Sequence, residues 1–531
     1  MSLPFSQTLG NIAQATLADS DPRPFCRVGA SAQGARSVWY AITPSVETFV
    51  NIEASGYDAM MAVYTGAPGG FLQVAGACND DGLASFASRL VGVRLQPGIA
   101  YSIYVAQFDG APTPAALNFQ VSAPAPYVVS QFADRAGSAC VAGNCSLREA
   151  VSASNANPAA IVLAAGTYTL SLPGAGEDFN ATGDLDVRDG LALYGQGVGL
   201  TVISAAAAGD RVLQLDPAAT TSRGYTFLLR GLTLADGNSP VDGGGIAPNT
   251  AAGANSNDYL AMERVTLRNN RAAGLGGGIR FNGYLEVDAS VIELNEANGN
   301  GGGIALVGGT NTRVEIRQAT LAENLSRASG GGIHSTSGTT TVVSSTLSGN
   351  RANGGGGAVF SAIAAPAAGL LLRYSTLANN QADADSNDLS EGGGLRLEGG
   401  AGGSLIGNLL SDNRLDGAAG PLNDCAIAPS AGVPVTASNF VRSVGSCEFN
   451  SSGDIVNLDP RLGPLANNPG GQRTHLPAFG SPALDGLAAG CPLLDQRGLV
   501  RPLDGNADQD ADCDFGAAES DVLFADGFPV L

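Results

Sequence analysis

The stretch Leu321-Ala-Glu-Asn-Leu-Ser-Arg-Ala-Ser-Gly330-Gly-Gly-Ile333 decides the fold, because variants of it recur along the chain. Each variant has an Asn soon after a Leu or Ile, and a run of three glycines that ends in an aliphatic residue. The glycine runs end at Ile246, Ile279, Ile304, Ile333, Ala358 and Leu395. The asparagines are Asn270, Asn295, Asn324, Asn350, Asn380 and Asn413, spaced by 25, 29, 26, 30 and 33 residues. A repeat of this length indicates a solenoid of stacked coils.

The segments between the glycine runs are short and rich in β-forming residues. Arg313–Ile316, Thr340–Val343 and Leu370–Arg373 are too short for helix pairs, and glycine is costly inside helices. Each repeat is therefore expected to form one coil of a parallel β-helix. The asparagines would stack as a ladder of hydrogen bonds, and the glycines would permit positive φ at a tight corner. A glycine-rich linker is the alternative, but it would not keep such a regular pattern.

Composition narrows the class of protein. The chain has 531 residues, 74 of them Gly, with 6% aromatic and 14% charged residues, which suits a thin solenoid core better than one large globule. The net charge of -21 disfavours nucleic acid and anionic membranes as partners. No transmembrane helix is visible. Residues 1–16 lack the features of a signal peptide, so we expect either a trimmed precursor or a mature form.

The eight cysteines fall into four local groups of two along the sequence. Proximity predicts the disulfides Cys26–Cys78, Cys140–Cys145, Cys425–Cys447 and Cys491–Cys513, although eight cysteines formally allow 105 pairings. Disulfides imply an oxidising compartment. Zinc is not expected, because there is no CxxC motif and there are only two histidines.

Residues 1–125 have the strand alternation of a compact β domain. The phrases Gly56–Gly66, Cys78–Gly82 and Gly98–Val105 resemble the β-sandwich modules of the pre-peptidase C-terminal type. That resemblance implies an accessory domain that binds carbohydrate or protein. Asp58, Asp80 and Asp81 could offer oxygen ligands to calcium, and the alternative is that they cap turns.

Residues 126–158 form a linker and an N-terminal cap. Cys145-Ser-Leu-Arg-Glu-Ala150 resembles the module of that sequence which opens bacterial surface β-helix proteins. We expect a short helix over 147–154 that covers the open end of the β-helix. Arg148 and Glu149 are expected to be a structural pair rather than catalytic residues.

Residues 159–455 are assigned to the β-helix, whose repeats resemble the polymorphic outer-membrane proteins of bacteria. Asp184 and Asp186 are two apart on an expected strand, so their carboxylates point to the same side. Such a pair could bind calcium or cleave a polysaccharide by acid–base catalysis, and surface turn chemistry is the alternative. His334 is expected to be an ordinary surface residue.

Residues 456–520 resemble the choice-of-anchor Q region of bacterial surface proteins, through Asp459-Pro-Arg, Gly480–Gly486, Asp495-Gln-Arg and Asp514–Glu519. That resemblance implies a C-terminal cap and surface attachment, with Asp495, Arg497 and Arg501 in a capping ion network. An acidic loop follows that could hold calcium or remain solvated. Its oxygen ligands would come from Asp504, Asn506, Asp508, Asp510, Asp512 and Asp514. The tail 521–531 resembles short export tags.

Together these patterns predict an all-β chain: a right-handed parallel β-helix with an N-terminal β-sandwich and a capped C-terminus. The function expected from the sequence is that of a non-enzymatic, adhesive or glycan-binding protein, exported by a Gram-negative bacterium to its surface or outer membrane. Its partner would be an extracellular polysaccharide or a surface protein, and calcium the only cofactor.

Two alternatives stay open. One is a polysaccharide lyase or glycoside hydrolase that uses Asp184 and Asp186, with Arg280 or Arg396. The other is a self-associating structural subunit. Adhesion is preferred because no acids recur at the position after each glycine phrase, where the sequence has Ala247, Arg280, Ala305, His334, Val359 and Arg396.

Overall fold

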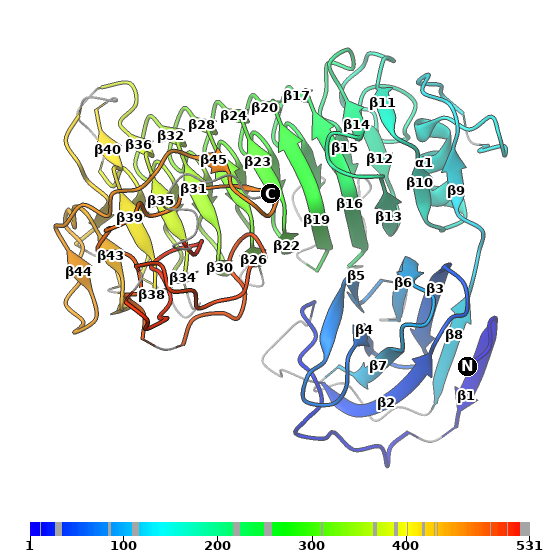
Figure 1. The fold of residues 1–531 in the computed structure, drawn as a ribbon. Coiled ribbons are helices and arrows are strands. Elements are labelled where there is room, and N and C mark those ends of the chain that lie inside the picture. The colour runs from blue at the N-terminus through cyan, green and yellow to red at the C-terminus, as the bar shows by residue number, and fades with distance from the viewer. Residues whose placement is uncertain are drawn as a thin grey trace. The chain divides into compact units, whose positions relative to one another are not determined.

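The fold is known from a computed structural model and confirms the predicted class. The chain is all-β, with a parallel β-solenoid of about 9 turns and antiparallel sheets at the N-terminus (Figure 1). The structure describes residues 1–10, 12–26, 34–82, 87–108, 116–137, 139–215, 224–248, 257–308, 312–364, 369–386, 391–400, 402–416, 420–429, 431–432, 434–488, 490–506 and 508–520. Within these residues no helix has the length and hydropathy needed to cross a membrane.

The chain divides into two compact units, and each is described by itself. Unit 1 comprises Met1–Thr233, Pro248–Val265 and Asn282–Glu286, and unit 2 comprises Leu234–Ala247, Thr266–Phe281 and Val287–Leu531. All four disulfides join the cysteines that the spacing paired: Cys26–Cys78, Cys140–Cys145, Cys425–Cys447 and Cys491–Cys513.

Unit 1 begins with two antiparallel four-stranded sheets. One has the order β1 (Phe5–Leu9), β8 (Leu117–Ser122), β3 (Thr48–Ser55), β6 (Ser88–Leu95). The other has the order β2 (Ala35–Ile42), β7 (Tyr101–Gln107), β4 (Ala59–Thr65), β5 (Leu72–Asp80). Alternate residues of β8 are buried and exposed, so one face of its sheet packs into the core around Ile52 and Phe119.

The same unit contains the first coils of the solenoid. Their strands are β9 (Tyr127–Val129), β10 (Ile161–Leu163), β11 (Gly166–Thr169), β12 (Leu185–Val187), β13 (Leu191–Tyr194), β14 (Thr201–Ser204), β15 (Leu213–Leu215) and the start of β16 (Thr226–Ala235). The sandwich packs against these coils through aromatic and alanine side chains. Hydrogen bonds fix the contact: Asn79 Nδ2 donates to the Gly224 carbonyl at 2.7 Å and Tyr194 Oη to the Gly92 carbonyl at 2.9 Å.

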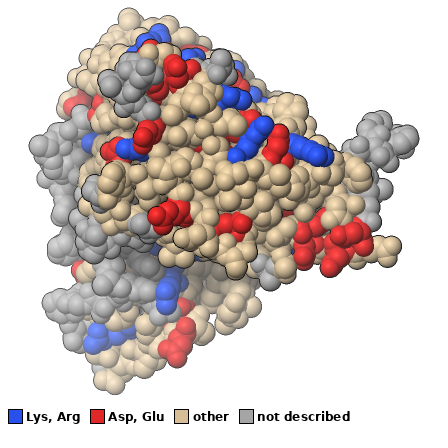
Figure 2. All heavy atoms as spheres, turned by 90° about the vertical axis from the view of Figure 1, so that its left-hand side faces the viewer, with Lys and Arg blue, Asp and Glu red and all other residues tan. Residues whose placement is uncertain are grey.

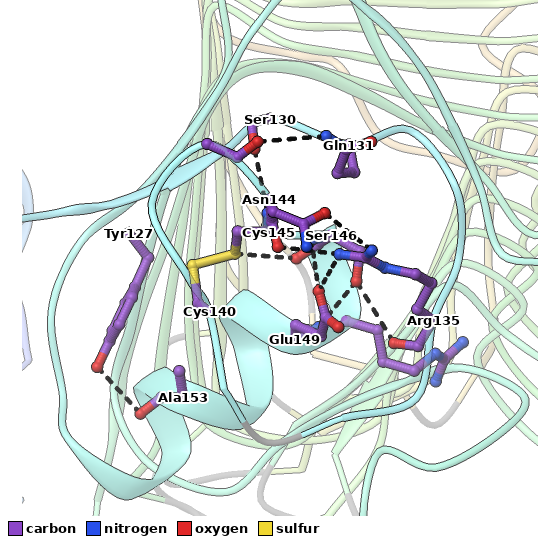
Figure 3. The surroundings of a disulfide bond; sticks show 12 residues. Tyr127, Ser130, Gln131, Arg135, Cys140, Asn144, Cys145, Ser146, Glu149 and Ala153 are labelled. Carbon is purple, nitrogen blue, oxygen red and sulfur yellow. Dashed lines mark hydrogen bonds and ion pairs between the residues drawn. A yellow bond between two sulfur atoms is a disulfide. The ribbon is translucent and has the colours of Figure 1, made fainter.

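The expected cap helix is α1 (Leu147–Ala156), which contacts β9, β10 and β12. Ser146 and Glu149 form a capping box at its start, which satisfies backbone N–H groups that the first turn leaves free. Figure 3 shows Glu149 also meeting Arg135, at 2.7 Å, beside the Cys140–Cys145 disulfide. Arg148 and Glu149 were expected to be a structural pair, but Glu149 pairs with Arg135 and not with Arg148.

Arg148 is instead fully buried and joins the cap helix to the first coil. Its guanidinium pairs with Asp134 at 2.7 Å and donates to the carbonyls of Gly183 and Asp184 at 2.8 and 2.6 Å. A buried Arg with this many partners is a structural clamp, because removing it would leave buried acceptors unpaired.

In unit 2, one wall of the solenoid is formed by the strands that follow the glycine runs. In sheet order they are β18 (Ile246–Pro248, whose last residue belongs to unit 1), β21 (Ile279–Phe281), β25 (Ile304–Leu306), β29 (Ile333–Ser335), β33 (Val359–Ser361), β37 (Leu395–Leu397) and β41 (Cys425–Ile427). The first residue of each strand, aliphatic except for Cys425 of β41, points inward and is buried. The middle residues therefore form an outward column.

A second wall precedes the glycine runs. Its strands are β17 (Asn238–Ser239), β20 (Arg271–Ala272), β24 (Glu296–Ala297), β28 (Leu325–Ser326), β32 (Arg351–Ala352), β36 (Gln381–Ala382) and β40 (Arg414–Leu415), which follow one another in a row in Figure 1. Outward arginines on this wall meet acids of neighbouring coils: Glu296 pairs with both Arg271 and Arg327. Figure 2 likewise shows arginines close to acidic side chains on one face.

The remaining wall has two strands in most coils. In unit 2 its members are the end of β19 (Tyr259–Arg268), the end of β22 (Tyr284–Asp288), β23 (Val291–Glu293), β26 (Arg313–Arg317), β27 (Thr320–Ala322), β30 (Thr339–Val343), β31 (Thr346–Ser348), β34 (Gly369–Arg373), β35 (Thr376–Ala378), β38 (Ser404–Ile406), β39 (Leu409–Ser411), β42 (Val435–Ala437), β43 (Phe440–Val441) and β44 (Ile455–Val456).

The asparagine ladder runs through the buried corner of unit 2 as predicted. The side chain of Asn350 donates through Nδ2 to Asn380 Oδ1 at 2.9 Å and to the Leu321 carbonyl at 2.9 Å. Its Oδ1 accepts from the backbone N–H and Nδ2 of Asn324, at 3.1 and 2.9 Å. The ladder ends where Asp424 accepts from Asn413. A carboxylate suits a terminus because it accepts and has nothing left to donate.

A second ladder was not predicted. Ser345, Ser375, Asn408 and Asn439 stack at another corner, and Asp454 ends that ladder in the same way. Its signal in the sequence is weaker, because the ladder changes from serine to asparagine after two coils and no glycine run accompanies it.

The glycines permit neighbouring coils to approach closely. Gly276 has φ +68, and a Cβ on Gly277 would lie 2.4 Å from the Gly302 carbonyl oxygen. One copy of the repeat is shifted by one residue from the expected register. His334 pairs with Phe360, so Ala358 takes the third glycine position and Phe360, not Val359, points outward.

The C-terminal region runs back along the side of unit 2. Thr320, Thr346 and Thr376 form one column of paired strands. Gln496 bonds to the first two of these hydroxyls at 2.9 and 2.5 Å, and the Ala517 N–H donates to the third at 3.0 Å. In the expected ion network Asp495 pairs with Arg497, whereas Arg501 pairs with Glu519. A short hairpin, β45 (Ala466–Asn467) and β46 (Arg473–Thr474), belongs to the same region.

Asn350→Ala should lower the stability of the chain by about 2–4 kcal/mol, because it removes four hydrogen bonds and leaves buried partners unsatisfied. Denaturant unfolding followed by circular dichroism measures this. Arg351→Ala, at the next residue but exposed, is the control and should change stability little. Equal effects of the two substitutions would contradict the role of the ladder.

Candidate functional site

A group of carboxyl groups lies in unit 1, where the loop 171–183 meets β12. Asp186 is the outward residue of β12 and pairs in register with Gln214 of β15. The loop turns back over this strand: the Asn180 N–H donates to Asp186 Oδ2 at 2.7 Å, and Gln214 Nε2 donates to Asp178 Oδ1 at 3.1 Å. The strand pair therefore holds carboxyl groups from two separate segments together.

The carboxyl group of Glu177 lies beside that of Asp186, close enough for each to change the pKa of the other. Burial raises the pKa of Asp186 to about 8, against the hydrogen bond from Asn180, and the charges of Glu177 and Asp178 add to the increase. Burial also acts to raise the pKa of Glu177, but hydrogen bonds from the N–H groups of Thr182, Ala181 and Phe179 outweigh it and lower that pKa. At neutral pH Asp186 therefore stays protonated beside an ionised Glu177.

The two carboxyl groups predicted from the sequence occupy different environments. Asp184 lies beside Arg211, with Oδ2 3.4 Å from Nε, and Asp210 is a second neighbour of that arginine. Burial, together with Asp186 and Asp210, raises the pKa of Asp184 well above its ordinary value, against Arg211 and Arg148. Asp184 and Asp186 are both buried, so surface turn chemistry does not describe them.

Two carboxyl groups of this site were not identified from the sequence. Glu177 and Asp178 are partly exposed, unlike Asp184 and Asp186. They lie in a loop between two strands of one coil, outside the repeat pattern, so no periodic position marked them. The only available signal was a pair of adjacent acids in a glycine-rich insertion.

The predicted arginines lie in unit 2, on the outward column of the wall that begins at β18. Arg280, Ala305, His334, Phe360 and Arg396 follow one another in register. Arg280 has Asp242 at 3.9 Å, and Arg396 pairs with Glu391 and Glu398. His334 is 4% exposed rather than a surface residue, and burial lowers its pKa to about 4. Its ring stacks on Phe360.

The three aspartates proposed for calcium in the sandwich lie together. Asp58, Asp80 and Asp81 each place a carboxylate oxygen within 4.8 Å of the others. Burial and the charge of Asp58 raise the pKa of Asp81 to about 6, against a hydrogen bond from Asn257. Hard carboxylate oxygens in such a group fit calcium, and the calcium site stays a prediction.

The acidic loop at the C-terminus is arranged differently. Carboxylate and amide oxygens there accept from the backbone of the loop itself: Asn506 from the Asp508 N–H, Asp508 from the Asp510 N–H and Asp504 from the Gln509 N–H. Within the described residues, Asp504, Asp508, Asp510 and Asp512 do not form a group with metal-ligand spacing. Calcium binding by this loop is still a prediction, and the tail 521–531 lies outside the described residues.

Comparison with known proteins gives matches to solved structures only. No family model matches the chain, and no curated protein sequence does. One matching structure is the catalytic unit of a thermostable GH87 alpha-1,3-glucanase from Streptomyces thermodiastaticus strain HF3-3, 14% identical, with 86% of this chain and 96% of that chain covered and a TM-score of 0.25. Another is the Agl-KA catalytic domain, 10% identical, with 81% and 95% covered and a TM-score of 0.21. A variant GH87 alpha-1,3-glucanase catalytic domain with tetrasaccharides is 12% identical, with 85% and 96% covered and a TM-score of 0.20.

These matches correct the function expected from the sequence. A non-enzymatic adhesive or glycan-binding protein was expected, whereas the matched structures are catalytic domains of glucanases. TM-scores of 0.25 and below carry no argument about the residues of this chain.

Asp186 should make the chain less stable as the pH rises. Its pKa is raised to about 8 in the folded state and is ordinarily about 4 in an unfolded chain. Between these two pKa values the folded state holds a proton that the unfolded state has released. The stabilisation that Asp186 gives the folded state is therefore present in full below about pH 4 and is lost progressively between about pH 4 and about pH 8. Thermal unfolding at several pH values should show that Asp186→Asn reduces the loss of stability over this range. An unchanged pH dependence would contradict the assignment.

Calcium should raise the melting temperature, and a chelator should reverse the increase, because a cation would offset the repulsion among Asp58, Asp80 and Asp81. Differential scanning calorimetry of wild type and Asp81→Asn measures this, and the variant should lose the response. If Asp81→Asn responds to calcium as wild type does, the ion binds elsewhere, for example in the acidic C-terminal loop.

Proposed function

We propose that the chain is a glycoside hydrolase that acts on a polysaccharide at the carboxyl site of unit 1. The observation that carries the proposal is the loop folded over β12, which places Glu177 and Asp178 beside the buried Asp186 and shifts the pKa values of Glu177 and Asp186 in opposite directions. When the pKa values of neighbouring carboxyl groups are shifted in opposite directions, one group is protonated and the other is ionised at the same pH. Acid–base cleavage of a glycosidic bond requires such a pair.

The roles follow from exposure and charge. Asp186 is buried and keeps a proton at neutral pH, whereas Glu177 is partly exposed and able to meet a sugar. Glu177 would pass the proton from Asp186 to the glycosidic oxygen as the bond to the leaving sugar breaks. Asp178, held by Gln214, would accept a proton from the water whose oxygen joins the anomeric carbon. One water is consumed, and the proton taken by Asp178 returns to Asp186 through solvent.

Other features support the setting of this reaction. Four disulfides fit an exported protein in an oxidising compartment. The resemblance of Cys145–Ala150 and of residues 456–520 to modules of bacterial surface proteins supports a location at the surface of a Gram-negative cell. The N-terminal sandwich would then be an accessory domain beside the first coils.

A panel of neutral and acidic polysaccharides, assayed for new reducing ends, tests this proposal. Wild type should release reducing ends from at least one of them, with activity falling above about pH 8 as Asp186 loses its proton. Glu177→Gln and Asp186→Asn should each lower the rate by about 100-fold or more. Glu47→Gln, which removes a surface partner of Arg94 on the sandwich, is the matched control.

Three outcomes would overturn the hydrolase. One is the absence of new reducing ends on every polysaccharide, and another is full activity in both site variants. The third is a product with the ultraviolet absorbance of an unsaturated sugar, because elimination consumes no water and would make the enzyme a lyase.

A further inference from the structure

An exposed aromatic ring stands beside the carboxyl site of unit 1. Phe179 lies in the loop 171–183 and is 71% exposed, so its ring projects into solvent instead of packing on the coil. It directly follows Asp178, and its backbone N–H donates to Glu177 Oε2 at 3.2 Å. The same short segment therefore carries the ring and the two partly exposed carboxyl groups of the site.

The residues on both sides of Phe179 are held in place. Asp178 Oδ1 accepts from Gln214 Nε2 at 3.1 Å. Asn180 is 2% exposed, and its Nδ2 donates to the Arg148 carbonyl at 2.8 Å. Its backbone has φ +62, a left-handed conformation that Asn adopts more readily than most residues. Because both neighbours are anchored, the exposure of the Phe179 ring is a fixed feature of the loop.

A guanidinium group holds the ring from one side. Arg188 directly follows β12, and its Cζ lies over the Phe179 ring, 4.7 Å from the centroid. The face of an aromatic ring is electron-rich and attracts a cation. Phe179 is still 71% exposed although Arg188 covers one face, so the opposite face of the ring is open to solvent.

The open ring lies close to the buried acid of the site. Asp186 and Arg188 are two residues apart, a spacing that puts both side chains on the outward side of an extended segment and spans about 7 Å. The N–H of Asn180, the residue after Phe179, donates to Asp186 Oδ2 at 2.7 Å. A polymer that reaches the carboxyl groups therefore passes close to the ring as well.

The ring and the charges around it favour a neutral sugar. The C–H groups on one face of a pyranose carry a slight positive charge and pack on the electron-rich face of an aromatic ring, and the contact also removes apolar area from water. An anionic sugar is disfavoured, because Glu177 has a lowered pKa and is ionised at neutral pH, and the chain carries a net charge of -21. The one cation beside the ring, Arg188, already faces it.

We propose that Phe179, held by Arg188, is the platform of a subsite that binds one sugar ring of a neutral polysaccharide. The sugar stacks on the open face of the Phe179 ring and keeps the adjoining part of the polymer at Glu177 and Asp178. No bond forms or breaks at this subsite. The identification of this sugar as part of a substrate rests on the proposed hydrolase, whereas the stacking needs only the exposed ring.

Phe179→Trp tests the platform in the full chain. Tryptophan keeps a flat aromatic ring and adds a fluorophore to a chain that otherwise has only Trp39. The ligands are neutral oligosaccharides of glucose, galactose or mannose, and oligosaccharides of galacturonic acid. At least one neutral oligosaccharide should shift the emission of Phe179→Trp and should bind this variant as tightly as wild type in isothermal titration calorimetry. Phe179→Ala should bind it roughly 10-fold more weakly, because the stacked contact is lost.

Two more variants make the test decisive. Phe479→Ala removes another exposed phenylalanine, in unit 2 and 59% exposed, and as the matched control should bind as wild type does. No emission change with any neutral oligosaccharide, or equal binding by wild type and Phe179→Ala, would overturn the platform. Tighter binding of the acidic than of the neutral oligosaccharides, lost in Arg188→Gln, would overturn the neutral sugar and make Arg188 the partner of a carboxylate.

The outcomes separate this proposal from the hydrolase. Binding at Phe179 in a chain that releases no reducing ends would leave the platform standing and remove the hydrolase. Cleavage with unchanged KM and kcat in Phe179→Ala would leave the hydrolase and overturn the platform. If both hold, Phe179→Ala should raise KM for the cleaved polysaccharide roughly 10-fold and change kcat little, because stacking holds the polymer equally in the ground state and the transition state.

Discussion

The asparagine ladder is the interaction on which unit 2 depends. Each amide accepts from the coil before it and donates to the coil after it, so the corner of every coil stays bonded whatever loops intervene. This explains why spacings of 25 to 33 residues give the same corner. Glycine is the companion constraint, because with the corners held this close a Cβ at Gly277 would meet the backbone of the next coil.

A regular wall of this kind holds its side chains at fixed positions. Unusual chemistry therefore arises where a residue departs from the repeat pattern. The outward column of unit 2 is mostly small or ion-paired, and it departs from that pattern at the stacked pair of His334 and Phe360. In unit 1 the exception is the loop 171–183, which brings Glu177 and Asp178 over β12. The rigid strands hold Asp186 and Gln214 in place, and the loop supplies the partly exposed carboxyl groups of Glu177 and Asp178.

Burial determines which of these residues carry a charge. Asp186 and Glu177 lie in contact, yet the strand carboxyl group has few donors while the loop carboxylate is bonded by three backbone N–H groups. The proton therefore stays on Asp186. The same loss of solvation keeps His334 neutral. Two acids two residues apart in the sequence, Asp184 and Asp186, likewise differ in their partners: one faces Arg211 and the other faces Glu177.

The sequence by itself determined the coil, the ladder, the glycine corners and the disulfide pairs, because each depends on residue type at short or periodic spacing. It also located Asp186, Arg280 and the aspartates of the sandwich as candidates. Only the tertiary structure decided which of these meet, since contacts across coils depend on register, as the one-residue shift that turns Phe360 outward shows. Burial was equally out of reach of the sequence. The loop that covers Asp186 and the packing that encloses His334 arise from long-range contacts, and these set the protonation that the chemistry uses.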